Sequence, residues 1–386
     1  MQQDIVFSTF LIFAGASVLA TFALYTRQPV LIAYIALGAL VGPFGMGWIE
    51  HPEQLENMSH IGIIFLLFLL GLDMQPSSLI SVLRQASTVG LVSSLLFFIA
   101  GFAVTWVFGY SQMDSIIIGL ALMFSSTIIG LKLLPTTVLH HKHMGELMVG
   151  LLLLQDMLAI FTLILLGVMK GESDMPVWQP FLALPLLIGV AYLTVKGILL
   201  PLITRFDRYQ EYLFILAIGW CLALAEGAQL VGLTYEIGAF IAGITLATSP
   251  IAQFIAISLK PLRDFFLVMF FFALGAGLNL GMLSSVAFSA IALAIVVLTL
   301  KPVAFRILLR RFSERTSLAW DVGFRLGQIS EFSLLIGFVA VESDLLTERG
   351  SLLIQATAII TFVVSSYIVV FNYPNPIAVS DKLRRD

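Results

Sequence analysis

The sequence predicts an all-α polytopic membrane protein with about thirteen transmembrane helices. Of its 386 residues, 59% are hydrophobic and 11% are charged, whereas an ordinary soluble domain is about 25% charged. The apolar residues form successive runs close to the roughly 20 residues that a helix needs to cross a bilayer. A soluble core in a chain of this size cannot bury so much apolar surface, so lipid is the expected surrounding of most helices.

Thirteen apolar segments are expected to be membrane spans, several of them short or interrupted by Gly and Pro. No basic residue precedes the first segment, which is therefore expected to be a span and not a cleaved signal peptide. The expected spans are residues 5–25, 29–48, 60–74, 85–109, 114–134, 144–168, 179–201, 211–231, 234–249, 254–280, 284–309, 316–342 and 350–372.

The basic residues follow this division into spans. Of the twenty Lys and Arg residues, Lys170 and Arg349 lie in loops after even-numbered spans, and Lys301 and Arg325 lie inside spans. All the others lie after odd-numbered spans, at the neighbouring span edges or in the C-terminal segment. Because loops rich in Lys and Arg stay on the cytoplasmic side, we expect the N-terminus outside and the C-terminus in the cytoplasm.

Two groups of five spans are expected to form an inverted repeat, at about 29–168 and about 234–372, with the first span, 5–25, outside it. The fourth span of each group is interrupted by polar residues, in the first group by Ser125, Ser126 and Thr127, and in the second by a stretch that includes Gln328, Ser330 and Glu331. Inverted repeats with paired broken helices are typical of transporters. The alternative is that the Ser and Thr hydroxyls only bond to their own helix.

Asp156 is the outstanding candidate for a functional side chain. It lies in the middle of the span 144–168, in LLLLQDMLAIF, with no basic residue within a helical turn. A charged residue at this depth costs roughly 2.5–3.5 kcal/mol on insertion scales. A carboxylate is a hard oxygen ligand for an alkali ion and can carry a proton in its place. A structural carboxylate paired across helices is the alternative.

The neighbouring Gln155 is expected to ligate a cation or to orient the site through its amide, or else to pack between helices. A neutral amide gives a weaker field than a second carboxylate. A weaker field favours the cation that is cheaper to dehydrate, which is potassium over sodium.

Three further charged residues, Lys301, Arg325 and Glu331, lie inside expected spans, and the last two flank the second break. Lys301 precedes Pro302, which frees backbone groups, and is expected either to pair with a core carboxylate such as Asp156 or to reach the surface by snorkelling. Glu331 is expected to stabilise the break or to line an ion path, and the alternative is a simple charge pair with Arg325 or Lys301.

These residues favour transport over other classes of function. A channel needs a filter of repeated backbone carbonyls, and no filter-like sequence is present. An enzyme needs a nucleophile with a base, or a metal, and a lone Asp156 is not enough. No motif indicates a cofactor, a metal other than a monovalent cation, or nucleic acid as a partner.

Several motifs together resemble one transporter family. GPFGMG (42–47), FSSTIIG (124–130), LLLLQDMLAI (151–160), IGAFIAGITLA (237–247) and GQISEFSLLIGFVA (327–340) resemble the membrane domain of monovalent cation:proton antiporters of the second major branch. The Gln–Asp pair and the GQISEF stretch are most similar to Kef-type potassium:proton antiporters, the glutathione-gated potassium efflux systems.

The resemblance implies that residues 1–386 form a single transmembrane domain in a bacterial inner (plasma) membrane, in which a six-helix core moves like an elevator against the scaffold of a homodimer. It implies that Asp156 binds the cation and the proton, with Gln155 and the polar residues of the two breaks around it. Kef-type proteins continue into a cytoplasmic nucleotide-binding domain, whereas this sequence ends at Asp386. Either a regulatory cytoplasmic domain is missing from this chain or this member is unregulated, so we assign no gating to its residues.

Overall fold

In the computed structural model, all regular secondary structure in the described part of the chain is helical, and this part holds no strand. The structure describes residues 5–374 apart from 27, 29, 50–60, 63, 66, 70, 73–75, 133–142, 170–178, 234, 250–251 and 313. The prediction of an all-α fold is confirmed.

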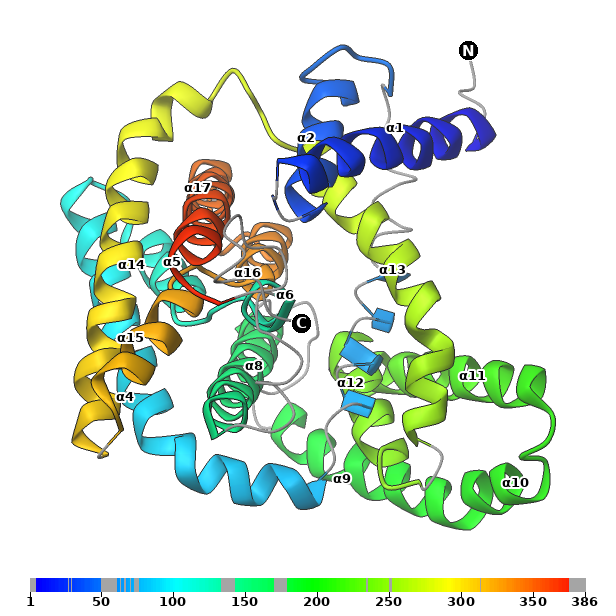
Figure 1. The fold of residues 1–386 in the computed structure, drawn as a ribbon. Coiled ribbons are helices and arrows are strands. Elements are labelled where there is room, and N and C mark those ends of the chain that lie inside the picture. Colours follow the sequence, from blue (N-terminus) through cyan, green and yellow to red (C-terminus); the bar gives the residue numbers. More distant parts are fainter. Residues whose placement is uncertain are drawn as a thin grey trace. The chain divides into compact units, whose positions relative to one another are not determined.

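Most helices overlap the expected spans, although the expected span 60–74 lies partly outside the described residues. Figure 1 shows the helices in chain order by colour. Their bounds are α1 Ile5–Tyr25, α2 Val30–Val41, α4 Pro76–Val107, α5 Gln112–Leu122, α6 Thr127–Lys132, α8 His143–Met169, α9 Gln179–Thr194, the π-helical turn η1 Val195–Leu199, α10 Leu200–Arg205, α11 Gln210–Leu230, α12 Tyr235–Leu246, α13 Ala252–Ala276, α14 Leu283–Arg311, α15 Thr316–Arg325, α16 Glu331–Glu342 and α17 Glu348–Asn372.

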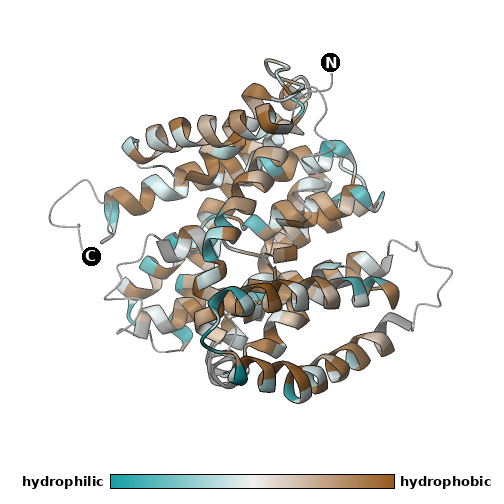
Figure 2. Ribbon diagram, turned by 90° about the vertical axis from the view of Figure 1, so that its right-hand side faces the viewer, coloured by the Kyte–Doolittle hydropathy of each residue, from teal (hydrophilic) through white to brown (hydrophobic). Residues whose placement is uncertain are grey.

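Length and composition suit these helices to a bilayer. Among the described residues, seven helices are long and apolar enough to cross a membrane, and three shorter apolar helices accompany them. Figure 2 shows hydrophobic residues along most of the helices. Helices that are apolar on most sides are typical of membrane spans.

The chain divides into two compact units. The first comprises Met1–Gly15, Leu37–Ile80 and Gly167–Gly277. Small residues allow its helices to pack closely, as is usual between membrane helices. A Cβ atom on Gly71, for example, would fall 2.5 Å from the backbone oxygen of Phe240 in α12.

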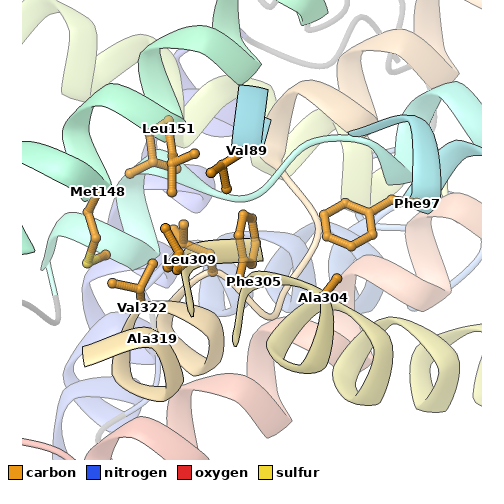
Figure 3. Close-up of a cluster of buried hydrophobic side chains, with 11 residues drawn as sticks. Val89, Phe97, Met148, Leu151, Ala304, Phe305, Leu309, Ala319 and Val322 are labelled. Carbon is orange, nitrogen blue, oxygen red and sulfur yellow. The ribbon is translucent and has the colours of Figure 1, made fainter. Parts of the chain in front are cut away.

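The second unit comprises Ala16–Ala36, Ser81–Leu166 and Leu278–Asp386. It holds most of α4 together with α5, α6, α8 and α14–α17. Side chains of α4, α8, α14 and α15 form a buried hydrophobic cluster in this unit, shown in Figure 3, whose members are Val89, Phe97, Met148, Leu151, Leu152, Ala304, Phe305, Leu309, Ala319, Val322 and Leu326.

Both predicted breaks are present, and both lie in this second unit. The first lies between the end of α5 at Leu122 and the start of α6 at Thr127, and the second lies between α15, which ends at Arg325, and α16, which starts at Glu331. Each break exposes the polar backbone groups of two helix ends, which lipid cannot satisfy. The partners of these groups therefore define the centre of the unit.

Candidate functional site

The two breaks bond directly to each other. The hydroxyl of Ser125 donates to the backbone oxygen of Leu326 at 2.9 Å, and the amide nitrogen of Gln328 donates to the backbone oxygen of Ser126 at a long 3.5 Å. Ser125, Ser126 and Gln328 are fully buried. The polar residues predicted to interrupt the two helices therefore meet across some 200 residues of sequence.

Serines also begin both of the following half-helices. Ser126 precedes α6, and its hydroxyl accepts a hydrogen bond from the backbone N–H of Ile129 at 3.1 Å. Ser330 precedes α16, and its hydroxyl accepts one from Phe332 at 3.1 Å. Ser is among the preferred residues at this position because its oxygen satisfies an otherwise unpaired N–H group.

Lys301 of α14 donates hydrogen bonds to both breaks. Its ammonium donates to the backbone oxygens of Phe124 at 2.6 Å and Gln328 at 3.0 Å, and to the hydroxyl of Ser125 at 3.2 Å. It is 1% exposed and lies 5.1 Å from the ring centre of Phe97. These acceptors are neutral and follow the C-terminal ends of α5 and α15, where helix dipoles favour a cation. Lys301 thus joins the two breaks, and it does not reach the surface.

Close packing of α14 on α15 sets the position of Lys301. A Cβ atom on Gly323 of α15 would fall 2.9 Å from both Cα and the backbone oxygen of Pro302. Backbone atoms of a packed helix cannot move aside as a flexible side chain does. The glycine therefore allows α15 to approach the turn of α14 that carries the lysine.

We expect Gly323→Ala to destabilise the protein by about 1–3 kcal/mol, the usual cost of overpacking. The control is Gly219→Ala in α11, where an added Cβ atom meets nothing within 4 Å and alanine favours the helix. Melting temperatures in one detergent compare the two variants. Equal melting temperatures would show that the α14–α15 contact does not depend on a glycine.

Asp156 lies in the middle of α8 and is 1% exposed. The hydroxyl of Thr127, the first residue of α6, lies 3.1 Å and 3.3 Å from its two carboxyl oxygens. Among the described residues, no basic side chain forms an ion pair with Asp156. The carboxyl group therefore has a hydroxyl neighbour, which suits a cation or a proton, and among the described residues no fixed positive charge is bonded to it.

Gln155 forms a hydrogen bond with the first break. Its amide oxygen accepts a hydrogen bond from the backbone N–H of Ser125 at 2.9 Å. Within the described residues its amide nitrogen has no hydrogen-bond partner, although the side chain is fully buried. An amide oxygen has a second lone pair, so Gln155 can orient the break and still offer an oxygen to a cation.

Arg325 and Glu331 stand at the two sides of the second break. Arg325 forms an ion pair with Asp321 at 2.6 Å and donates to the backbone oxygen of Pro374 at 2.7 Å. Glu331 is 5% exposed and lies near enough to Asp156 for the two carboxyl groups to interact electrostatically. A second acidic group thus stands close to the central one.

Comparison with known proteins shows the family to which this chain belongs. The family model described as "Sodium/hydrogen exchanger, transmembrane" matches residues 9–371. The chain belongs to the sodium/hydrogen exchanger family. The resemblance inferred from the motifs is thereby confirmed, and an integral membrane location goes with it.

Two curated relatives in this family come from Arabidopsis thaliana. The chain is 29% identical to K(+) efflux antiporter 4 over 349 residues, and 28% identical to K(+) efflux antiporter 6 over 346 residues. Each match covers 87% of this chain but 58% of the relative. The chain therefore spans less than two thirds of the length of these relatives.

A solved structure shares the fold of this chain. The sodium proton antiporter MjNhaP1 from Methanocaldococcus jannaschii, at pH 8, superimposes with a TM-score of 0.72. The match covers 94% of this chain and 96% of that chain at 17% sequence identity. At this identity the likeness establishes the fold alone.

The sequence interpretation missed several polar residues that hold the breaks. The hydroxyl of Ser333 donates to the backbone oxygen of Ala121 in α5. Thr361 and Ser365 of α17 bond to the second break. A signal was present in the sequence, because Thr357, Thr361 and Ser365 recur every four residues in a largely apolar span.

Proposed function

We propose that this chain exchanges potassium for protons across a membrane by alternating access, with Asp156 as the group that carries either the cation or the proton. The observation that supports this most strongly is the buried Asp156 carboxyl group, with a hydroxyl as its partner, beside two joined helix breaks. Family membership supports the same class of function.

The chemistry follows from the groups at the site. A deprotonated Asp156 supplies a negative charge and hard oxygens, and the hydroxyl of Thr127 and the amide oxygen of Gln155 add neutral oxygens, as alkali ions require. A proton on Asp156 removes that charge and releases the cation. The two occupants therefore exclude each other, which couples their movements.

Reconstitution into liposomes that contain a pH-sensitive dye tests the exchange. A potassium gradient is expected to drive proton movement in the opposite direction. Potassium movement without any proton movement would contradict the proposal and would favour a channel.

Potassium is proposed ahead of sodium because Gln155 stands where a second carboxylate would strengthen the field. The named relatives are potassium efflux antiporters and the solved structure is a sodium antiporter, so sodium is the alternative ion. The weaker field of an amide favours the ion that loses its hydration shell more cheaply.

We expect Gln155→Asp to shift the preference toward sodium by about tenfold, as an electrostatic difference of about 1.4 kcal/mol gives. The measurement is the half-saturating concentration of each ion in the dye assay. Gln355→Asp in α17 is the control, because it adds a carboxylate elsewhere in the same unit. Better exchange of sodium than of potassium by the unchanged protein would contradict the assignment.

An elevator-like movement is part of the proposal. Its support is the division of the chain into two compact units, with both breaks, Asp156 and Lys301 in one of them. Homodimerisation through the other helices, an outside N-terminus, a cytoplasmic C-terminus and a bacterial inner membrane stay predictions. A monomer by native mass measurement in mild detergent with lipid would contradict the dimer.

A further inference from the structure

Polar side chains follow one face of α17, the last helix. Thr357, Thr361 and Ser365 are four residues apart, so they lie one above another on the helix. Each is at most 1% exposed. Burying hydroxyl groups in an apolar span is costly unless they are bonded, so their partners are informative.

Two of these hydroxyls bond to the second break. The backbone N–H of Ile329 donates to the hydroxyl of Thr361 at 3.4 Å. The hydroxyl of Ser365 lies 2.8 Å from the amide oxygen of Gln328 and 3.3 Å from the backbone oxygen of Phe324. Thr361 also donates to the backbone of its own helix, at Ala358. Among the described residues, Thr357 bonds only within its own helix, where it donates to Leu353.

Gln328 connects α17 to the first break and to Lys301. Ser365 holds its amide oxygen, its amide nitrogen faces the backbone oxygen of Ser126, and its own backbone oxygen accepts from Lys301. A flipped amide would set two oxygens against each other at Ser126. The Ser365 bond therefore selects the orientation of Gln328 that joins the second break to the first.

We propose that Ser365 and Thr361 of α17 are positioning residues for the cation site, which they shape by fixing Gln328 and Ile329 without touching the cation. This inference rests on the proposed function and deepens it. It adds α17 to the elements that define the site, beside α8, α14 and the two broken helices.

Loss of the Ser365 hydroxyl is expected to weaken cation binding more than turnover. Without it the amide oxygen of Gln328 has no donor among the described residues, and the binding-competent arrangement becomes a minor state. Apparent affinity falls by the fraction of competent molecules, while a saturating cation restores that arrangement. Ser365→Ala should therefore raise the half-saturating potassium concentration about tenfold and leave the saturating rate within about twofold.

The chain supplies matched controls. Ser366 is adjacent and equally buried, and its hydroxyl has no hydrogen-bond partner among the described residues. Ser366→Ala should leave half-saturation unchanged. Thr361→Val should weaken binding and Thr357→Val should not, because Thr357 bonds within its own helix. Ser365→Thr keeps the hydroxyl and should restore binding.

The test has two readouts on purified protein. One is half-saturation against saturating rate in dye-loaded liposomes, and the other is the rise of melting temperature with potassium, which reports binding without transport. If Ser365→Ala does not fold, Thr361→Val carries the same comparison with Thr357→Val.

The expected result is weaker potassium binding by Ser365→Ala and Thr361→Val than by their controls in both readouts. Equal behaviour of Ser365→Ala and Ser366→Ala would overturn the inference, as would a loss of stability or rate at unchanged half-saturation. An inactive wild-type protein would contradict the proposed function, and the melting-temperature comparison would still decide the role of α17.

Discussion

Replacing Asp156 by Asn is expected to reduce cation-driven proton movement by at least about 100-fold while the protein stays folded. An Asn side chain has the same shape, and its amide oxygen can still accept from Thr127. It has no charge to hold a cation and no proton to exchange, so the coupling is lost. Removal of a directly acting group has effects of about this size. Dye-loaded liposomes measure the rate, and size-exclusion chromatography with a melting curve checks the fold.

Asp114→Asn is the matched control for this experiment. Asp114 is also a buried carboxyl group in the second unit, where it accepts from the backbone N–H of Thr347 at 2.9 Å and from its hydroxyl at 3.0 Å. Its bonds start α17, and Asn keeps an acceptor there. Substantial flux in Asp156→Asn, or an equal loss in Asp114→Asn, would contradict the assignment of Asp156.

Replacing Lys301 by Met is expected to cost the folded protein about 3 kcal/mol or more and to lower exchange together with stability. The backbone oxygens of Phe124 and Gln328 would lose their donor, and each unpaired buried group costs about 1–3 kcal/mol. Lys196 of η1 is exposed, so Lys196→Met should change the melting temperature little. Melting curves of both variants in one detergent give the comparison.

The protonation of Lys301 also determines whether exchange moves net charge across the membrane. We expect electroneutral exchange, because Asp156 carries one potassium ion or one proton and Lys301 keeps its proton to hold the helix ends. Membrane potential, worth about 2.3 kcal/mol per charge per 100 mV, then gives no net drive. Solid-supported-membrane recording with a potassium jump at symmetric pH should show no sustained charge displacement. A sustained signal that Lys301→Gln removes while exchange persists would make Lys301 a proton carrier.

Much of the fold was predictable because its causes are local. Apolar length locates the spans, and the serines at 125 and 126 and the stretch 327–330 interrupt two of them where the structure has its breaks. Thr127 and Glu331, also predicted to interrupt the helices, begin the following half-helices. Asp156 was a candidate because it lies in the middle of an apolar span and no neighbouring residue in that span offsets its charge. The function of these residues is still a proposal, and their positions agree with it.

The partners of these residues were not predictable because they lie far apart in the chain. Lys301 bonds across 177 residues to Phe124, and two of its three acceptors are backbone oxygens, which leave no mark in a sequence. Pairing with Asp156 was the natural expectation for a buried cation, but two helix ends supply enough negative charge for it. Ser365 went unnoticed because a hydroxyl in a span commonly bonds to its own helix.

Uphill movement of the cation is the most direct test of the account. Liposomes with the unchanged protein are given a proton gradient, outward-directed, at zero membrane potential, and uptake of a rubidium tracer, a close analogue of potassium, is followed. Rubidium is expected to accumulate above its external concentration. This accumulation should collapse when a protonophore removes the gradient and should be absent in Asp156→Asn. Uptake that only equilibrates, with or without the proton gradient, would contradict the proposed exchange.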